Sequence, residues 1–395
     1  MAAFPSAPVS DPSTVDELAA AARASGRIGV DTEFMGEGRY QSELCLTQVS
    51  VEEGGELRIE LIDPQSDIDP TPLAEVLADP AVEVVFHAGR QDVAILRRTW
   101  QTDVTTVFDT QVGAAFLGLG PQLGYSPLVG RVLGKELKSS AAFTRWDTRP
   151  LTEEQLRYAA EDVLDLLEVA GELQRRLREH GRLEWAREEC RAVAASSDER
   201  DPAETWRRLP KSNRLSPRQS AVARELAAWR DRTARSENRP PASVVADAPL
   251  AEIAKRRPAA IGDLKSIRGL HPPVIKRRGE AMLAAVRDGN EAEPIEREST
   301  PRTDPDPADA PVIALAESLI RQRVLEANLA YELVAARKEL NVLVAARRKG
   351  REDPDVRVLS GWRRELVGDE LLELLAGRLA VTREPGAGVR VAPVG

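Results

Sequence analysis

Cysteine, histidine and aromatic residues are scarce in this chain of 395 residues, which contains 2 Cys, 3 His and 4% aromatic residues. Cys45 and Cys190 cannot by themselves form a disulfide framework or a zinc site, so the sequence favours a reducing compartment. Three histidines leave little scope for metal sites built on imidazole. So few aromatic residues favour several small, helix-rich units over one large core.

Long apolar runs are also missing from the sequence. No 18 apolar residues follow one another, so we expect no membrane-spanning segment and no membrane partner. The N-terminus lacks the basic region and the apolar run of a signal peptide. We therefore expect a soluble, cytoplasmic protein, and no feature of the sequence indicates an obligate protein partner.

The net charge of −9 argues against a nucleic-acid partner when it is taken for the whole chain, because binding to phosphates needs basic side chains. The charge is unevenly distributed, however: residues 1–204 carry −17, residues 205–289 carry +11 and residues 290–395 carry −3. A basic middle segment is therefore hidden by an acidic first one. A polar break at 195–202 and a stretch rich in proline and acidic residues at 289–311 mark the same divisions.

The order of strand and helix patterns predicts the domains. Short apolar runs predict strands at 28–30, 44–49, 57–62 and 82–86. Strands interspersed with helices are typical of an α/β layer fold. A capping-box pattern at Thr152 and Gln155 predicts a helix over 153–179. We predict an α/β domain at 1–204, a basic all-α domain at 205–289, a linker at 290–311 and a second all-α domain at 312–395.

The two all-α domains are predicted from different patterns. In the basic domain, prolines open a series of short helices, at Pro217, Pro240-Pro241, Pro249 and Pro272-Pro273. In the last domain, helical spacing predicts one long helix from about 312 to 348 and another after Ser360.

Candidate catalytic residues follow the predicted strands. Asp31 and Glu33 come directly after an apolar strand, and residues two apart in an extended chain point to the same side. Asp92 lies early in the helix that follows the strand at 82–86. Each of these carboxylates is ordinary when taken alone, since acidic side chains are common in solvated turns and in the first turn of a helix.

The predicted helix at 153–179 adds Tyr158 and Asp162, which share one face because they are four residues apart. Glu161 or Asp165 could take the role of Asp162. Hydrolysis of a phosphodiester by two metal ions needs several carboxylates and a group that orients the attacking water. Magnesium prefers oxygen ligands, so the lack of Cys and His ligands is no obstacle.

These residues carry a resemblance to a known family. The segments concerned are Asp31-Thr32-Glu33-Phe34, His87-Ala88-x-x-x-Asp92 and Tyr158-x-x-x-Asp162. They resemble the three exonuclease motifs of the DEDD superfamily, in its tyrosine-containing branch, and are most similar to those of the ribonuclease D family. Similar flanking segments are Leu44 to Val49, Phe108 to Gln111 and Trp146 to Leu151, so the resemblance spans most of residues 12–190.

The rest of the chain extends the resemblance. Residues 214–288 resemble an HRDC domain, the helical module that RecQ-type helicases share with ribonuclease D. Segments 335–340 and 360–366 resemble the second C-terminal helical domain of that family. The fold implied is a ribonuclease H-like exonuclease domain, with a mixed sheet flanked by helices, followed by two all-α, HRDC-like domains.

The resemblance also implies a function and the residues that carry it. The function is a metal-dependent 3'-to-5' exoribonuclease that releases nucleoside 5'-monophosphates from structured RNA such as tRNA precursors. Two divalent ions, Mg²⁺ or Mn²⁺, would be held by Asp31, Glu33, Asp92 and Asp162. Tyr158 would orient the attacking water or help to deprotonate it. The residues expected to contact the substrate are Glu33, Phe34, His87 and Gln48; a buried, structural Phe34 is an equally good interpretation.

Two runs in the basic domain form the predicted nucleic-acid-binding patch: Lys255, Arg256, Arg257, Lys276, Arg277 and Arg278. The alternative is that they are solvated helix ends, but a net charge of +11 is a concentrated excess. Two other functions remain open at this point. One is a DNA exonuclease of the same superfamily. The other is an RNA-binding adaptor with an inactive nuclease domain, which the presence of all four carboxylates and Tyr158 disfavours.

Overall fold

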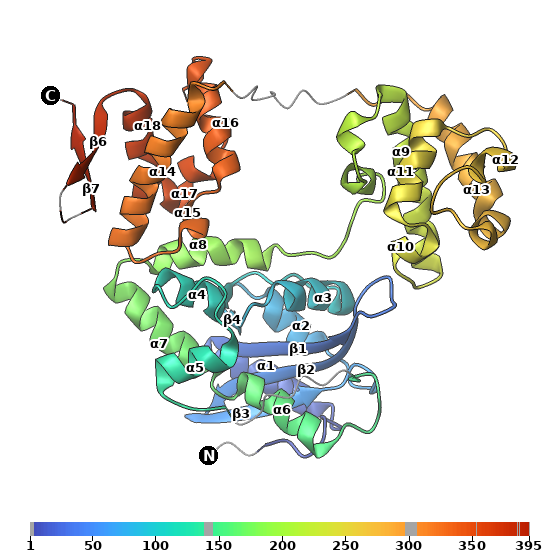
Figure 1. The fold of residues 1–395 in the computed structure, drawn as a ribbon. Helices are drawn as coiled ribbons and strands as arrows, with labels where there is room; N and C mark the ends of the chain where they lie inside the picture. Colours follow the sequence, from blue (N-terminus) through green and yellow to red (C-terminus); the bar gives the residue numbers. More distant parts are fainter. Residues whose placement is uncertain are drawn as a thin grey trace. The chain divides into compact units, whose positions relative to one another are not determined.

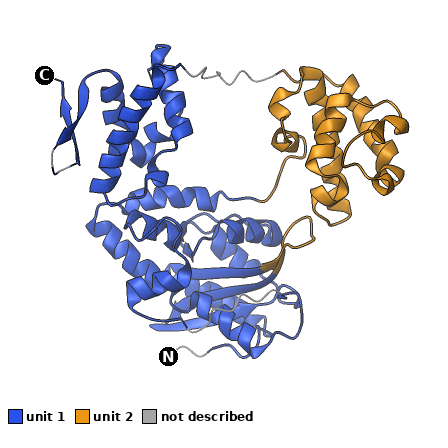
Figure 2. Ribbon diagram, in the orientation of Figure 1, with its two compact units in different colours: residues 1–33, 45–197, 301–395 blue, residues 34–44, 198–300 orange. Residues whose placement is uncertain are grey.

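The computed structural model describes residues 4–137, 145–296, 306–352, 354–384, 386 and 388–394. The chain forms two compact units (Figure 2): one comprises residues 1–33, 45–197 and 301–395, and the other residues 34–44 and 198–300. The two segments of the second unit thus interrupt the sequence of the first at two places. The domain boundaries expected after residues 204, 289 and 311 stay predictions.

A five-stranded mixed sheet is the centre of the first unit (Figure 1), with the strand order β3-β2-β1-β4-β5. The strands are β1 Arg27–Met35, β2 Glu43–Glu53, β3 Glu56–Ile62, β4 Glu83–Phe86 and β5 Val107–Asp109. Strand β4 runs parallel to both β1 and β5, whereas β2 and β3 run antiparallel to each other. The α/β fold expected from the strand patterns is confirmed.

The same part of the chain contains the helices α1 Ser13–Ser25, α2 Thr71–Ala78, α3 Arg90–Trp100, α4 Thr110–Phe116, α5 Tyr125–Leu133, α6 Glu153–Leu164, α7 Leu166–Glu179 and α8 Leu183–Ala194. Helix α7 approaches β1 closely at Gly29. A Cβ there would lie 2.3 Å from Ser50 Oγ and 3.4 Å from atoms of Leu166 and Leu167. The contact with Ser50 on β2 is therefore the one that a larger residue would disturb, whereas the contacts with α7 would remain ordinary.

The single helix predicted over 153–179 is wrong, because the structure has two helices separated at Asp165. The start was predicted correctly: Thr152 and Gln155 form the capping box. The break occurs where the buried Asp165 carboxylate accepts a hydrogen bond from Lys135 Nζ at 2.7 Å. The spacing of apolar residues could not reveal this break, because the partner of Asp165 is Lys135, 30 residues earlier in the chain.

The C-terminal segment is also more divided than predicted. The long helix expected from 312 to 348 is three helices, α14 Asp309–Glu326, α15 Tyr331–Val334 and α16 Arg337–Arg348. The first break contains Asn328 in the left-handed conformation, with a φ of 50°. Asparagine is one of the few residues that adopt this conformation readily.

The end of the chain includes a strand pair. Beyond Ser360 come α17 Gly361–Arg363, a π-helical turn Arg364–Gly368 and α18 Asp369–Leu375. An antiparallel pair follows, β6 Leu379–Glu384 and β7 Gly388–Pro393. The last segment is therefore helical except for this pair, and the all-α prediction was wrong there.

The second unit is helical apart from the segment 34–44. It contains 3-10 turns at Thr205–Arg208 and Ser212–Arg214, followed by α9 Pro217–Ser236, α10 Pro241–Val244, α11 Asp247–Arg256, α12 Ile261–Leu264 and α13 Pro272–Glu291. Prolines open α9, α10 and α13 as predicted, whereas α11 begins at Asp247, two residues before Pro249. Ser216 and Gln219 form a capping box before α9. Residues 297–305 of the expected linker lie outside the described residues. No helix in the described part of the chain is long and apolar enough to cross a membrane.

Candidate active site

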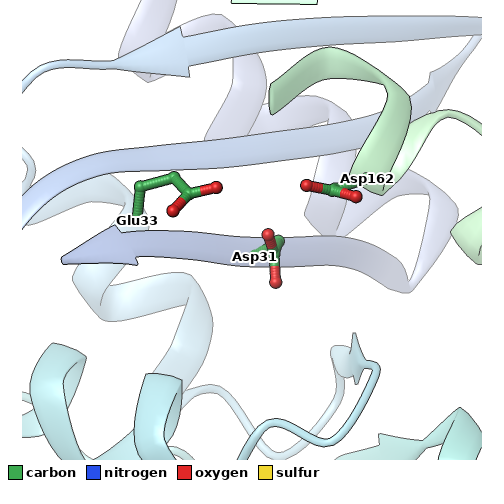
Figure 3. A group of neighbouring side chains, drawn as sticks. All are labelled: Asp31, Glu33 and Asp162. Atoms are coloured by element: carbon green, nitrogen blue, oxygen red, sulfur yellow. The ribbon is translucent and has the colours of Figure 1, made fainter. Parts of the chain in front are cut away.

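Three carboxylates meet where β1 and α6 come together (Figure 3). Asp31 and Glu33 extend from β1, and Asp162 extends from α6. One carboxylate oxygen from each residue lies within 4.8 Å of the other two. The two-residue spacing on an extended strand places Asp31 and Glu33 on one side, and the helix supplies the third carboxylate.

Burial raises the pKa of every member of this carboxylate cluster, and repulsion from nearby carboxylates adds to the rise; for Asp162 that neighbour is Glu161. Desolvation is the largest cause for each residue. The pKa of Asp31 is held well above its usual value by burial, then by Asp92, Asp162 and Glu33. The pKa of Glu33 is raised to about 8, and that of Asp162 to about 7. At neutral pH, then, the carboxylate cluster retains protons unless a cation neutralises it.

Asp92 lies beside the carboxylate cluster without belonging to the group of three. It is in the first turn of α3, and its Oδ1 accepts a hydrogen bond from Thr32 Oγ1 at 2.5 Å. Burial raises the pKa of Asp92 to about 6, while the hydrogen bond from Thr32 opposes the rise. Thr32 is a residue that the sequence analysis missed. It lies between Asp31 and Glu33, and alternation along the strand directs it to the other side.

Tyr158 is bonded to the carboxylate cluster through Asp162. Its phenol forms a side-chain hydrogen bond with the Asp162 carboxylate, four residues further along α6. Burial and the nearby carboxylates, Asp162 first, raise the pKa of Tyr158. The phenol therefore keeps its proton at neutral pH and is a hydrogen-bond donor to the carboxylate.

The other residues expected to contact the substrate have varied surroundings. His87 Nδ1 lies 2.9 Å from Thr110 Oγ1, and burial lowers the pKa of its ring. Gln48 is fully buried on β2, and its amide has no hydrogen-bond partner among the described residues. Phe34 is half-buried on β1. Within the described part of the chain, none of these three side chains forms a hydrogen bond with the carboxylate cluster.

Two further residues near the site were missed by the sequence analysis. The ring of Tyr125 lies 5.4 Å from that of His87, and burial followed by the charges of Asp165, Asp162 and Asp31 raises its pKa. Nothing in the local sequence around Tyr125 indicates this position.

The second missed residue, Asp109, fixes the start of α3. Its carboxylate accepts hydrogen bonds from the backbone N–H groups of Ala88 at 3.1 Å and Gly89 at 2.9 Å. The same carboxylate caps α4 through Gln111 N and Val112 N. An Asp directly before a helical segment is a capping signal, and it could have been recognised in the sequence.

The expected basic patch in the second unit is only partly available for binding. Five of its six side chains are on exposed residues, but Arg278 is buried and its Nη2 lies 2.7 Å from Glu237 Oε2. Arg278 was therefore wrongly included as a surface cation. Arg256 and Arg277 are exposed although each is paired with a glutamate.

The donor set of the carboxylate cluster fits a hard divalent cation. All three groups offer carboxylate oxygens, the ligands that Mg²⁺ prefers. An ion with bonds of about 2.1 Å spans oxygens up to about 4.2 Å apart, so the observed separations require only small side-chain movements. A cation would also stabilise the charged carboxylates, which burial and nearby negative charges disfavour.

Comparisons with known proteins define the class of this chain. The 3'-5' exonuclease family matches residues 7–178, which include the whole carboxylate cluster, and the HRDC domain family matches residues 219–286 in the second unit. The fold and the site are those of a metal-dependent 3'-to-5' exonuclease joined to an HRDC domain.

The relatives define the family. Ribonuclease D of Acidiphilium cryptum is 35% identical over 359 residues, which cover 90% of this chain and 89% of the relative. Ribonuclease D of Sphingobium indicum is 34% identical over 390 residues, 96% of both chains. The chain belongs to the ribonuclease D family and is a 3'-to-5' exoribonuclease that binds RNA.

Solved structures agree with this assignment. The crystal structure of Escherichia coli RNase D, an exoribonuclease involved in structured RNA processing, matches with a TM-score of 0.78 and 30% identity, over 92% of this chain and 97% of that one. The catalytic core of RRP6 from Trypanosoma brucei matches with a TM-score of 0.53 and 25% identity, over 72% of this chain and 80% of that one.

Proposed function

We propose that this exoribonuclease trims the 3' ends of structured RNA, tRNA precursors among them, and releases nucleoside 5'-monophosphates with the help of two Mg²⁺ or Mn²⁺ ions. The carboxylate cluster carries this proposal, because its three raised pKa values are those of a site built for cations. The structured RNA substrate is inferred from the ribonuclease D family and from the role of Escherichia coli RNase D in structured RNA processing.

Each acidic residue has a role in the proposal. Asp31, Glu33 and Asp162 hold the metal ions, and Asp92 assists through its charge and its position beside Asp31. When bound, such ions lower the pKa of a water molecule and neutralise charge that develops on the phosphate. Thr32 keeps Asp92 ionised by donating a hydrogen bond to it.

Tyr158 orients the attacking water in this proposal. Its hydroxyl is fixed by the hydrogen bond to Asp162, so its remaining lone pair is held beside the carboxylate cluster. The phenol acts by orientation, because its raised pKa leaves almost no phenolate at neutral pH to accept a proton from the water. Glu33, Phe34, His87 and Gln48 are proposed to contact the terminal nucleotide.

The exposed part of the basic patch is proposed to bind RNA phosphates away from the reacting bond. Its five available cations are Lys255, Arg256, Arg257, Lys276 and Arg277. Binding through phosphates alone would be independent of sequence and would weaken as salt is added.

The proposal is tested by product analysis on a 3'-labelled tRNA precursor, and on RNA and DNA oligonucleotides of one sequence. We expect Asp31→Asn and Asp162→Asn to lower the rate by more than about 100-fold, because partners outside the metal's own ligands already account for 10–100-fold. Glu154→Gln is the matched control, since Glu154 is an exposed carboxylate on the same helix as Asp162. Full activity of either asparagine variant would refute the site, and a preference for DNA would refute the substrate.

A further inference from the structure

Arg149 uses its whole guanidinium group to bind one segment of chain to the sheet. Its Nε and Nη2 donate to the two oxygens of Asp63, at 2.5 and 2.7 Å. Nη2 also donates to the carbonyl of Cys45 at 2.7 Å. Nη1 donates to the carbonyls of Trp146 at 2.7 Å and Thr148 at 3.0 Å. These five hydrogen bonds use all the N–H donors of an arginine.

The acceptors of Arg149 lie on two different parts of the first unit. Cys45 is in β2, and Asp63 directly follows β3, so both belong to the sheet. Trp146 and Thr148 belong to the segment that leads into α6. Asp63 is buried, and its carboxylate also accepts the backbone N–H of Gln65 at 2.9 Å. The sheet therefore holds a fixed acceptor, and Arg149 attaches the segment to it.

This segment contacts Tyr158. Trp146 is almost completely buried, and its ring lies 6.1 Å from the ring of Tyr158 at an angle of 42°. The first turn of α6 is joined to the same segment, because the capping residue Gln155 donates to the Arg145 carbonyl at 3.4 Å. The indole thus limits where the phenol ring can lie, and Arg149 limits where the indole can lie.

We propose that Arg149 is a positioning residue for Tyr158: by attaching the segment 145–150 to Asp63 and Cys45, it holds Trp146 against the phenol. The inference rests on the proposed role of Tyr158 in orienting the attacking water. A lysine cannot replace Arg149, because its three N–H donors are on a single atom. It therefore cannot donate hydrogen bonds to both oxygens of Asp63 and to three carbonyls at the same time. Misplacement of a positioned group by about 1 Å can cost about 100-fold in rate.

The test measures kcat and KM for Arg149→Lys in the wild-type protein and in a Tyr158→Phe background. In the wild-type protein we expect kcat to fall by about 10-fold or more, while KM changes by less than about 2-fold. In the Tyr158→Phe background the same substitution should change kcat by less than about 2-fold, because the group it positions is already gone. Arg145→Lys is the matched control, since its side chain is on the same segment and is 72% exposed.

Each outcome has a definite meaning. If Tyr158→Phe is slow but Arg149→Lys costs the same factor in both backgrounds, Arg149 acts otherwise and only this inference is overturned. If Tyr158→Phe keeps the wild-type rate, the proposed role of Tyr158 falls, and the inference falls with it. Asp63→Asn, which weakens the same attachment and keeps Arg149, is measured in the same cycle. Asp63→Asn must also lower kcat in the wild-type protein and leave it almost unchanged in the Tyr158→Phe background. If the Arg149 variant does not fold, this variant replaces it in the test.

Discussion

The carboxylate cluster should make the metal-free protein less stable than a variant that lacks one of its charges. Raising the pKa of Asp162 from 3.8 to about 7 corresponds to about 4 kcal/mol in favour of the protonated group. Burial is the largest cause of this shift and repulsion from Glu161 adds to it, but Asp162 is partly exposed, so we expect about half of this amount. We predict that Asp162→Asn stabilises the metal-free protein by about 2 kcal/mol at pH 8.

The sign of the pH dependence follows from the direction of the pKa shifts. Below about pH 3 the carboxyl groups are protonated in both the folded and the unfolded chain, so the carboxylate cluster does not lower the free energy of unfolding. As pH rises towards 8, the unfolded chain releases protons that the folded cluster retains, because the pKa of Glu33 is about 8 when folded. The metal-free wild type should therefore lose stability over this range, and Asp162→Asn should lose less.

Urea unfolding in EDTA, at pH 4.5 and pH 8, measures this difference. We expect the two proteins to differ by less than about 1 kcal/mol at pH 4.5. Addition of Mg²⁺ should make the wild type the more stable of the two proteins. At a Mg²⁺ concentration of a hundred times the dissociation constant, binding adds about 2.7 kcal/mol to its free energy of unfolding. Glu154→Gln is again the control. A metal-free Asp162→Asn protein that is less stable than the wild type at pH 8 would refute the repulsion argument.

Three further predictions follow from the described contacts. Thr32→Val should raise the pKa of Asp92 and lower activity by about 10-fold, with the acid side of the pH–rate profile displaced to higher pH. Lys255→Ala should weaken RNA binding and reduce its salt dependence by about one released counterion, which a salt titration measures. Arg278→Ala should mainly destabilise the second unit, because it removes the buried partner of Glu237, and thermal unfolding measures this loss. Trp362→Ala should destabilise the first unit by about 3–5 kcal/mol, measurable by urea unfolding, because that indole is fully buried.

Local signals in the sequence were sufficient to predict many of the elements. The strand that leads to Asp31 is an apolar run, and the helix that contains Tyr158 begins with a capping box. Both signals lie in residues that are neighbours in the sequence. The breaks at Asp165 and Asn328 could not be predicted in this way. The first accompanies an ion pair with Lys135, and the second is a left-handed residue without the usual glycine signal.

The same distinction applies to the site. The period of the strand predicted that Asp31 and Glu33 point to one side, and the resemblance to a family supplied Asp162. The link between Thr32 and Asp92 joins residues 60 positions apart, and neither residue predicts the other. Hydrogen bonds between distant segments depend on how the elements pack, which a single sequence does not reveal.

The packing of Trp362 has a consequence for the synthesis of the protein. Its indole stacks on Trp185 at 5.5 Å and donates to Glu189, and both partners lie on α8. The longer segment of the second unit, residues 198–300, lies between these partners in the sequence. At about 5–20 residues per second, the ribosome needs about 9–35 s to proceed from Trp185 to Trp362. During that time α8 presents an uncovered apolar face while the second unit can already fold, so the nascent chain passes through a state that chaperones would recognise.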